Sequence, residues 1–307
     1  MRSSEEWFRE LGWSAFPFQN QCKSLIVSGE SGLLNAPTGS GKTYALLLGI
    51  LEMYAQARSL GLERDSLFAI WITPIRALAE EIRLATERAI AGMQLDARVA
   101  VRTGDTDAAA KAKMDKQLPA ILITTPESMH LFLGRKEYPK KLQHLSYFIC
   151  DEWHELMGSK RGVLIELALS RLRSLRPHLS VWGISASIGN MQEAMEVLCR
   201  NGTLVKANIP KPIQVIPILP TEVEKMPWYG HLGIKLMDQV LPVIRSSKSC
   251  LLFTNTRAQA EIWYQRLLDA EPDLAGRMAI HHSSIAKEIR QWVEDQLHGG
   301  NLQLVVS

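Results

Sequence analysis

The feature that most restricts the fold of this chain is a glycine-containing stretch near its N-terminus. Residues 33–43 read Leu-Leu-Asn-Ala-Pro-Thr-Gly-Ser-Gly-Lys-Thr, and the helix-forming residues 44–54 follow. A short apolar run, a turn and a helix in this order form the context that a phosphate-binding loop requires. Ala36 occupies the place of that pattern's first glycine, where a small residue suffices unless the backbone needs a positive φ. We therefore interpret the stretch as a binding site for a nucleoside triphosphate rather than a turn that only begins a helix.

Each polar part of this loop has a distinct expected role. The two glycines let successive backbone N–H groups point inward, and the N-terminus of the following helix adds a partial positive charge. Lys42 supplies a charge for the outer phosphates, and the Thr43 hydroxyl can ligate Mg²⁺. The predicted nucleotide-binding residues of the loop are Thr38, Gly39, Ser40, Gly41, Lys42 and Thr43.

Composition excludes several classes of protein. The chain has 307 residues and a formal net charge of +3, which permits a polyanionic partner without requiring one. Its four cysteines form no C-x-x-C pair, which argues against a zinc site or a disulfide framework. The N-terminus lacks the apolar core of a signal peptide, and no apolar run reaches membrane-spanning length. We expect a cytoplasmic protein without a membrane partner.

Apolar runs alternate with helical segments along the first two thirds of the chain. The expected strands are residues 67–73, 98–102, 121–125, 147–150 and 180–185, and the expected helices are residues 75–91, 108–116, 127–133 and 163–175. Continuous apolar runs suit strands that are buried on both faces of a parallel sheet. The alternation predicts an α/β fold with a doubly wound parallel sheet, in which ligands bind beyond the carboxyl ends of the strands.

Prolines cluster after residue 208 and mark the expected boundary between two domains. Residues 208–212 read Asn-Ile-Pro-Lys-Pro, which resists both a helix interior and a central strand. Beyond them, residues 249–257 repeat the order of residues 31–39: an apolar strand, then a polar turn that starts a helix. The sequence therefore predicts domains over residues 1–209 and 210–307. We expect the second to be incomplete, because residues 302–307 end it at a strand with an open edge.

A second motif completes a phosphoryl-transfer site. The apolar run Tyr147–Cys150 leads directly into Asp151 and Glu152. Asp151 can hold Mg²⁺ through water, and Glu152 can orient and deprotonate the water that attacks the γ-phosphorus. An Asp-Glu pair elsewhere is commonly the solvated start of a helix, but here it accompanies a phosphate-binding loop. Together the two motifs predict hydrolysis of ATP or GTP.

These motifs resemble those of the superfamily 2 DExH-box helicases. The residue sequences of the motifs are similar to those of bacterial large helicase-related proteins, in the branch described as ligase-associated DNA damage response DEXH box helicases. The matching segments are residues 36–43, Thr73–Leu78 (motif Ia), Arg102–Thr106, Thr124–Ser128, Asp151–His154, Ser185–Ser187 (motif III), Phe253–Arg257 (motif IV) and His281–Ser284.

The resemblance implies roles for matched residues. Gln19 would read the adenine edge and favour ATP over GTP, with Phe16 or Phe18 close by unless these rings are plain core. His154, Ser185 and Ser187 would couple the γ-phosphate state to the strand-binding face, and His154 would belong to the catalytic set with Glu152, Asp151 and Lys42. The residues implied to hold strand phosphates are Arg76, Thr103, Thr125, Ser128, Thr254, Arg257 and Ser283. For the two arginines, an ordinary surface charge is the alternative.

The family further implies two RecA-like domains, the second truncated, that use ATP and Mg²⁺ to move along nucleic acid. The implied activity is that of a DNA-repair helicase or translocase of 3′→5′ polarity on single-stranded or tailed duplex DNA, with repair proteins such as a ligase as partners. Action on RNA or RNA–DNA hybrids, and an ATP-gated binding module without unwinding, stay open. Motifs V and VI are expected beyond residue 307, so this chain alone is expected to bind ATP but to hydrolyse it poorly.

Overall fold

The computed structural model describes residues 2–186, 188–209, 213–219 and 232–307. The chain divides into two compact units, Met1–Lys211 (unit 1) and Pro212–Ser307 (unit 2). The expected domain boundary at residues 208–212 lies partly outside the described residues, as does the predicted coupling residue Ser187. Among the described residues, no helix combines the length and apolar character needed to cross a membrane.

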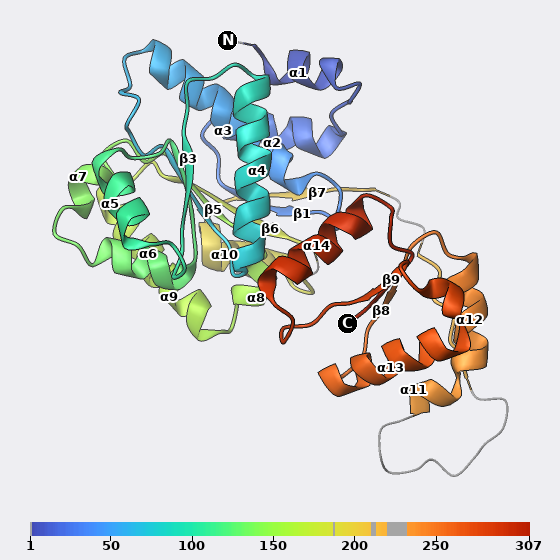
Figure 1. Ribbon diagram of the computed structural model, residues 1–307. Helices are drawn as coiled ribbons and strands as arrows, with labels where there is room; N and C mark the ends of the chain where they lie inside the picture. Colours follow the sequence, from blue (N-terminus) through green and yellow to red (C-terminus); the bar gives the residue numbers. More distant parts are fainter. Residues whose placement is uncertain (1, 187, 210–212, 220–231) are drawn as a thin grey trace. The chain divides into compact units, whose positions relative to one another are not determined.

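Unit 1 is built on a seven-stranded sheet whose paired strands all run parallel. The strands lie in the order β3-β4-β2-β5-β6-β1-β7 (Figure 1). Their bounds are β1 Gly32–Asn35, β2 Ala69–Ile72, β3 Val99–Arg102, β4 Ile121–Thr124, β5 Tyr147–Cys150, β6 Ser180–Ser185 and β7 Thr203–Lys206. This confirms the predicted doubly wound parallel α/β fold.

Helices cover both faces of this sheet. One face packs against α1 Ser4–Glu10, α2 Pro17–Val27, α3 Lys42–Ser59 and α4 Arg76–Gly92. The opposite face packs against α6 Pro126–Leu133, α7 Tyr138–Lys141, α8 Trp153–Leu156, α9 Lys160–Leu175 and α10 Met191–Cys199. The remaining helix, α5 Ala108–Lys116, contains no buried residue. In Figure 1, α4 lies across the front of the sheet and α9 lies behind it.

The pleat explains why the central strands read as continuous apolar runs. Within β2, Ala69 and Trp71 belong to the core under α1–α4, whereas Ile70 and Ile72 belong to the core under α6–α10. Successive side chains of a strand point to opposite faces, so a strand with helices on both sides needs apolar residues at every position. The carboxyl ends of the parallel strands meet at one edge, and the loops after β1, β2, β4 and β5 therefore gather there.

Unit 2 contains a three-stranded parallel sheet in the order β8-β10-β9. Its elements are α11 Leu232–Lys235, α12 Met237–Ser246, β8 Cys250–Leu252, α13 Arg257–Ala270, a 3₁₀ turn at Pro272–Leu274, β9 Met278–Ile280, α14 Lys287–His298 and β10 Leu304–Val306. Residues of α12 and α13 pack on one face, and Val293 of α14 packs on the other. The edge strand β8 leaves Leu251 53% exposed. The C-terminal strand β10, which was expected to have an open edge, is instead central and pairs with both β8 and β9.

Candidate nucleotide and nucleic-acid site

The phosphate-binding loop joins β1 to the N-terminus of α3. Gly39 and Gly41 both have φ +79°, a left-handed conformation that glycine adopts without steric cost. Of the described residues other than glycine, only Gln94, Glu152 and Arg200 have positive φ, so Ala36 fits its position with ordinary backbone geometry. Its amide donates a hydrogen bond to the Ser185 carbonyl at 3.0 Å, which ties the loop to the end of β6.

Two polar atoms of this loop are buried without a hydrogen-bond partner among the described residues. They are the Ser40 hydroxyl oxygen and the Lys42 ammonium nitrogen. An unpaired buried donor costs free energy, and such groups in a native site usually have a ligand as their partner. The N-terminus of α3, which begins at Lys42, presents free backbone N–H groups in the same place. The loop therefore has the donors, the charge and the backbone shape that fit a triphosphate.

Asp151 is buried at the carboxyl end of β5. Its carboxylate accepts hydrogen bonds from Trp71 Nε1 at 3.2 Å and from the Glu152 amide at 2.9 Å. Burial, with a smaller contribution from the neighbouring Glu152 charge, raises the pKa of Asp151 to about 6, against the lowering effects of Trp71 and Lys42. A buried carboxylate with a raised pKa lacks sufficient compensation for its charge, and a bound cation would supply it.

Glu152 links the acid pair to the loop. Its Oε1 lies 3.5 Å from Lys42 Nζ, and the two side chains are 20% and 11% exposed. Glu152 has φ +46°, a strained left-handed conformation for a residue with a Cβ. Strained backbone of this kind is concentrated at functional sites, and here it sets the direction of the carboxylate. The structure thus brings the two sequence motifs together although they are more than 100 residues apart.

His154 connects Glu152 to the end of β6. Its Nδ1 lies 3.4 Å from Glu152 Oε2 and 3.1 Å from the Ser185 hydroxyl, which is fully buried. A change in the charge or position of Glu152 would therefore act on His154 and Ser185 directly. The coupling role of the two residues stays a prediction, and Ser187 lies outside the described residues.

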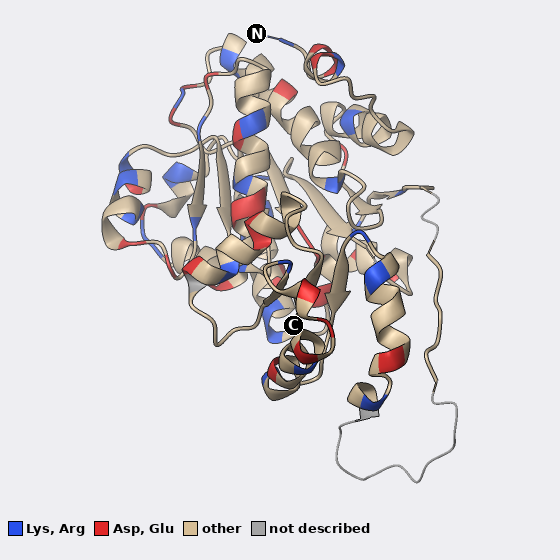
Figure 2. Cartoon of the chain, turned by 45° about the vertical axis from the view of Figure 1, so that its right-hand side comes forward, with Lys and Arg blue, Asp and Glu red and all other residues tan. Residues whose placement is uncertain are grey.

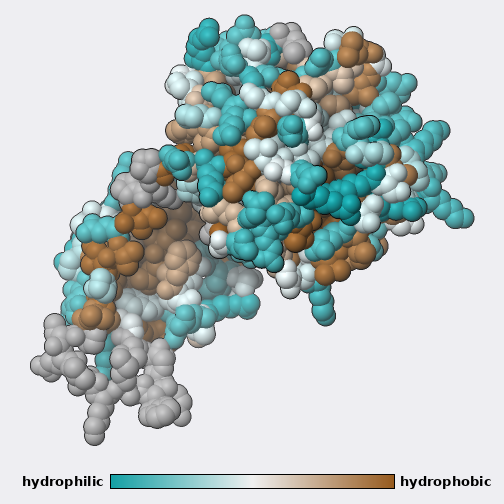
Figure 3. Space-filling view, turned by 180° about the vertical axis from the view of Figure 1, so that it is seen from behind, coloured by the Kyte–Doolittle hydropathy of each residue, from teal (hydrophilic) through white to brown (hydrophobic). Residues whose placement is uncertain are grey.

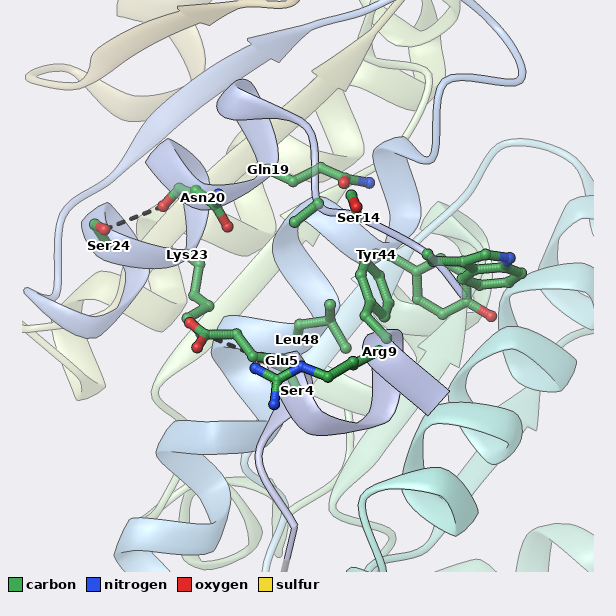
Figure 4. Close-up of a pocket in the computed structure, with 13 residues that line it drawn as sticks. Ser4, Glu5, Arg9, Ser14, Gln19, Asn20, Lys23, Ser24, Tyr44 and Leu48 are labelled. Carbon is green, nitrogen blue, oxygen red and sulfur yellow. Dashed lines mark hydrogen bonds and ion pairs between the residues drawn. The ribbon is translucent and has the colours of Figure 1, made fainter. Parts of the chain in front are cut away.

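Gln19 lies between the loop and a neighbouring pocket. Its side-chain amide donates to the Gly41 carbonyl at 3.1 Å and accepts from the Phe16 amide at 2.9 Å. Gln19, Trp13 and Tyr44 line a pocket of about 450 Å³, and Figure 4 shows Gln19, Ser14 and Tyr44 around the same hollow. That volume lies within the range of small-molecule sites. Phe18 is buried in the core, whereas Phe16 stacks on it at 5.9 Å and is 45% exposed.

The residues of unit 1 that were expected to hold strand phosphates lie in loops at the same sheet edge. Arg76 begins α4, and its guanidinium lies 2.5 Å from the Asp105 carboxylate in the turn after β3. Thr103 is buried in that turn. Thr125 and Ser128 begin α6, where the Thr125 hydroxyl accepts a hydrogen bond from the Ser128 amide at 3.4 Å. The Thr125 hydroxyl is engaged in capping α6, whereas Arg76 is exposed and ion-paired with Asp105.

The three candidates of unit 2 lie in two loops. The Thr254 hydroxyl donates to the carbonyls of Thr256 and Ser307, at 3.0 Å and 3.1 Å. The Arg257 guanidinium donates to the Ser284 hydroxyl at 2.6 Å, and Ser283 beside it is exposed. Arg257 thus contacts the loop that contains Ser283.

Two residues at the site were not predicted from the sequence. Trp71 holds Asp151 through its ring N–H, and Tyr44 lines the pocket beside Gln19. A signal existed for Trp71: a tryptophan inside a fully buried strand must place its N–H against an acceptor. Nothing in the sequence identifies Asp151, 80 residues away, as that acceptor.

Comparisons with known proteins identify relatives of this chain. Residues 16–195 match the profile of the DEAD/DEAH box helicase family. The chain is 33% identical to the ATP-dependent helicase Lhr-Core of Methanothermobacter thermautotrophicus over 98% of its own length. It also superimposes on the Mycobacterium smegmatis helicase Lhr bound to ssDNA and AMP-PNP, with a TM-score of 0.78 and 26% identity, over 98% of this chain and 40% of that one.

A third comparison concerns the fold alone. The DUF1998 helicase MrfA, in a crystal structure bound to DNA, gives a TM-score of 0.80 at 21% identity over 99% of this chain and 43% of its own. The fold of both units is therefore that of RecA-like helicase domains. The chain spans 37% of the length of the Methanothermobacter relative.

Proposed function

Because the chain belongs to the DEAD/DEAH box helicase family, we propose that it binds ATP and Mg²⁺ at the Lys42 loop and couples ATP hydrolysis to movement along a DNA strand. The observation that carries the proposal is the pairing of Lys42 with Glu152 at 3.5 Å, beside the buried Asp151. The left-handed backbone of Glu152 supports a functional role at this point, because such strain is concentrated at functional sites.

The residues divide the chemistry among themselves. Lys42, Ser40 and the N-terminal amides of α3 bind the phosphates, and Thr43 and Asp151 would hold Mg²⁺. Bound Mg²⁺ would neutralise the charge that develops on the phosphate oxygens. Glu152 accepts a proton from the attacking water, and its contact with Lys42 at 3.5 Å orients the carboxylate. Among the described residues, no group of three or more His, Cys, Asp or Glu could hold a metal. Mg²⁺ is usually bound through one or two carboxylates together with substrate phosphates and water.

The strand-binding part of the proposal rests on the exposed arginines and on the relatives. The Mycobacterium Lhr structure contains ssDNA, so we propose DNA as the preferred strand and RNA as the alternative. Phosphate contacts alone do not distinguish the two, because both strands present the same backbone charge. A 3′→5′ polarity, a cytoplasmic location and a repair partner such as a ligase stay predictions of the family resemblance.

The test compares Glu152→Gln with the unchanged chain in three measurements: ATP affinity, affinity for single-stranded DNA and RNA, and the rate of ATP hydrolysis with and without strand. We expect Glu152→Gln to retain ATP binding and to lower the hydrolysis rate, which is expected to be slow in the unchanged chain, by at least about 100-fold, because the proton acceptor is gone. Equal hydrolysis by the two proteins would contradict the assigned role of Glu152. An affinity for single-stranded DNA or RNA that is the same with and without ATP would contradict the proposed coupling.

A further inference from the structure

A strongly basic surface borders the strand-binding turns of unit 1. It is formed by residues 111–116 of α5 and residues 135–141 around α7, which we call the α5–α7 surface. These segments contain seven Lys and Arg against two Asp and Glu, an excess of five positive charges, whereas the whole chain has a net charge of +3. Figure 2 shows the blue segments on the left of unit 1. The rest of the chain is therefore net acidic.

The acidic residue at the centre of this surface is already paired. Asp115 lies 3.2 Å from the Arg102 guanidinium and 3.3 Å from the Lys141 ammonium, and it also pairs with Arg135. Burial opposes ionisation of Asp115, but the hydrogen bond from Arg135 and the charges of Arg102 and Lys141 lower its pKa on balance. One carboxylate facing three cations leaves an excess of positive charge that is fixed in position.

The outer side of α5 is open. The helix has no buried residue, and a shallow groove of about 470 Å³ runs beside Ala109, Ala112, Lys113, Lys116 and Gln117. Lys113 and Lys116 are exposed, and neither has a carboxylate partner among the described residues. The small alanines let a ligand's backbone approach the helix closely. Seen from behind, hydrophilic side chains project at this right-hand edge of the molecule (Figure 3).

The position of the surface indicates its ligand. α5 follows the turn that contains Thr103, and the segment around α7 follows α6, which begins after Thr125. Both turns carry residues that are expected to hold the strand, so the α5–α7 surface continues the same path. It offers no ring for base stacking, because its single aromatic residue, Tyr138, is buried. Single strands without sequence preference are usually held by stacking as well as by charge, whereas a duplex presents mainly phosphates.

We propose that the α5–α7 surface binds the phosphate backbone of the duplex part of a tailed substrate, next to the single strand held by the loops of unit 1. This inference rests on the proposed function and adds the duplex as its second ligand. Lys113 and Lys116 each contact a phosphate, and Asp115 holds Arg102, Arg135 and Lys141 in a fixed arrangement behind them.

The test uses the double variant Lys113→Glu/Lys116→Glu of the full chain and a charge-matched control, Lys160→Glu/Lys206→Glu. The two control lysines are exposed as well, and Lys206 lies on β7 at the sheet edge opposite to β3. Dissociation constants are measured for a tailed duplex and for a single strand that corresponds to its tail, at about 50 and 200 mM salt. Thermal melting of each protein verifies that it is folded.

We expect the α5 variant to bind the tailed duplex at least about tenfold more weakly at low salt and to bind the single strand as before. Raising the salt concentration from about 50 to 200 mM weakens binding of the tailed duplex in every protein. Because the α5 variant has lost two phosphate contacts, the factor by which its affinity falls should be about tenfold smaller than for the unchanged chain. The control variant retains both affinities. ATP affinity stays unchanged in all three proteins.

Three results would overturn the inference. The α5 variant could lose affinity for the single strand and for the tailed duplex equally, which would mean that the surface binds the single strand. It could retain both affinities like the control, which would mean that the surface binds an acidic protein or is only solvated. The unchanged chain could bind the tailed duplex no better than the single strand. Failure of the proposed function has a different signature, because the unchanged chain would then bind neither ATP nor single strand.

Discussion

The two units of this chain contain the same junction, a parallel strand that leads through a polar turn into a helix, and use it differently. In unit 1 the junction before α3 ends in Gly41, which has no side chain to cap the helix, and it leaves Ser40 and Lys42 without hydrogen-bond partners among the described residues. In unit 2 the junction before α13 ends in Thr256, whose side chain accepts a hydrogen bond from the Gln259 amide at 3.2 Å.

The difference shows what makes a helix N-terminus a ligand site. A capped N-terminus has satisfied part of its own N–H groups and is stable as it stands. An uncapped N-terminus with glycines and a lysine that lacks a hydrogen-bond partner is less stable alone, and a bound anion would complete it. This contrast supports the proposal that the nucleotide binds to unit 1, on physical grounds that do not depend on the motif. Four changes test this contrast, in order of expected effect.

The largest effect is expected from Lys42→Ala. Loss of a charged contact to phosphate in a largely buried site costs about 3 kcal/mol, so ATP affinity should fall by about 100-fold. Isothermal titration calorimetry measures it. The matched change in the other junction is Arg257→Ala, which should leave ATP affinity unchanged. An equal loss in both variants would remove the distinction between the two junctions.

The second effect concerns Asp151→Asn in the absence of Mg²⁺ and nucleotide. The pKa of Asp151 is raised from 3.8 to about 6, so ionisation is harder in the folded state than in the unfolded state. The carboxylate therefore does not reduce stability below about pH 4 and reduces it increasingly as the pH rises to about 6. The variant should gain roughly 3 kcal/mol in the free energy of unfolding at pH 7 and almost nothing at pH 4.

Denaturant unfolding at the two pH values measures this gain. Glu152→Gln is the comparison at the neighbouring position, where the side chain is partly exposed and lies 3.5 Å from Lys42, so no gain in stability is expected. If Asp151→Asn had the same effect at pH 4 and pH 7, a buried, incompletely compensated carboxylate could not be its cause.

The third effect separates two glycines of the loop. Gly41→Ala places a Cβ in left-handed backbone and 2.7 Å from Gln19 Nε2, which must then move and lose its bond to the Gly41 carbonyl. Gly39→Ala meets the same backbone cost but no atom within 4 Å. Left-handed backbone costs about 1–2 kcal/mol in either variant. Gly41→Ala should be less stable than Gly39→Ala by a further ~1 kcal/mol, measured by denaturant unfolding. Equal stabilities would show that Gln19 does not restrict the loop.

The smallest effect belongs to the capped junction. Thr256→Ala removes the hydrogen bond to the Gln259 amide and should lower the stability of unit 2 by about 1 kcal/mol. Hydrogen exchange of the amides of α13 measures it locally. ATP affinity is expected to stay the same, and a loss of affinity would mean that this junction also takes part in nucleotide binding.

Much of unit 1 could be predicted because its strands are buried on both faces and leave a simple pattern. The strands over 147–150 and 180–185 and the helix over 108–116 have the predicted bounds. The helix over 163–175 begins three residues earlier, at Lys160, because Ser159 caps it. The edge strand β7 was not predicted, because it is short and only partly buried. The hydrophobic pattern in the sequence is weaker where only part of a segment contacts the core.

The site was predictable as a set of residues but not as a set of contacts. The sequence motifs named Lys42, Asp151 and Glu152, and family resemblance added Gln19 and His154. The hydrogen bond from Trp71 to Asp151, the left-handed backbone of Glu152 and the contact of His154 with Ser185 come from tertiary packing. No local sequence pattern encodes these features, because they depend on strands and loops that only the order of the strands in the sheet brings together.

The central claim is that Asp151 and the Lys42 loop hold one magnesium nucleotide between them. The most direct measurement is the affinity for ATP by calorimetry, with and without Mg²⁺, in the unchanged chain and in Asp151→Asn. We predict that Mg²⁺ strengthens ATP binding by at least about tenfold in the unchanged chain, and that this gain disappears in Asp151→Asn while metal-free ATP still binds. A gain from Mg²⁺ that is the same in both proteins would contradict the claim.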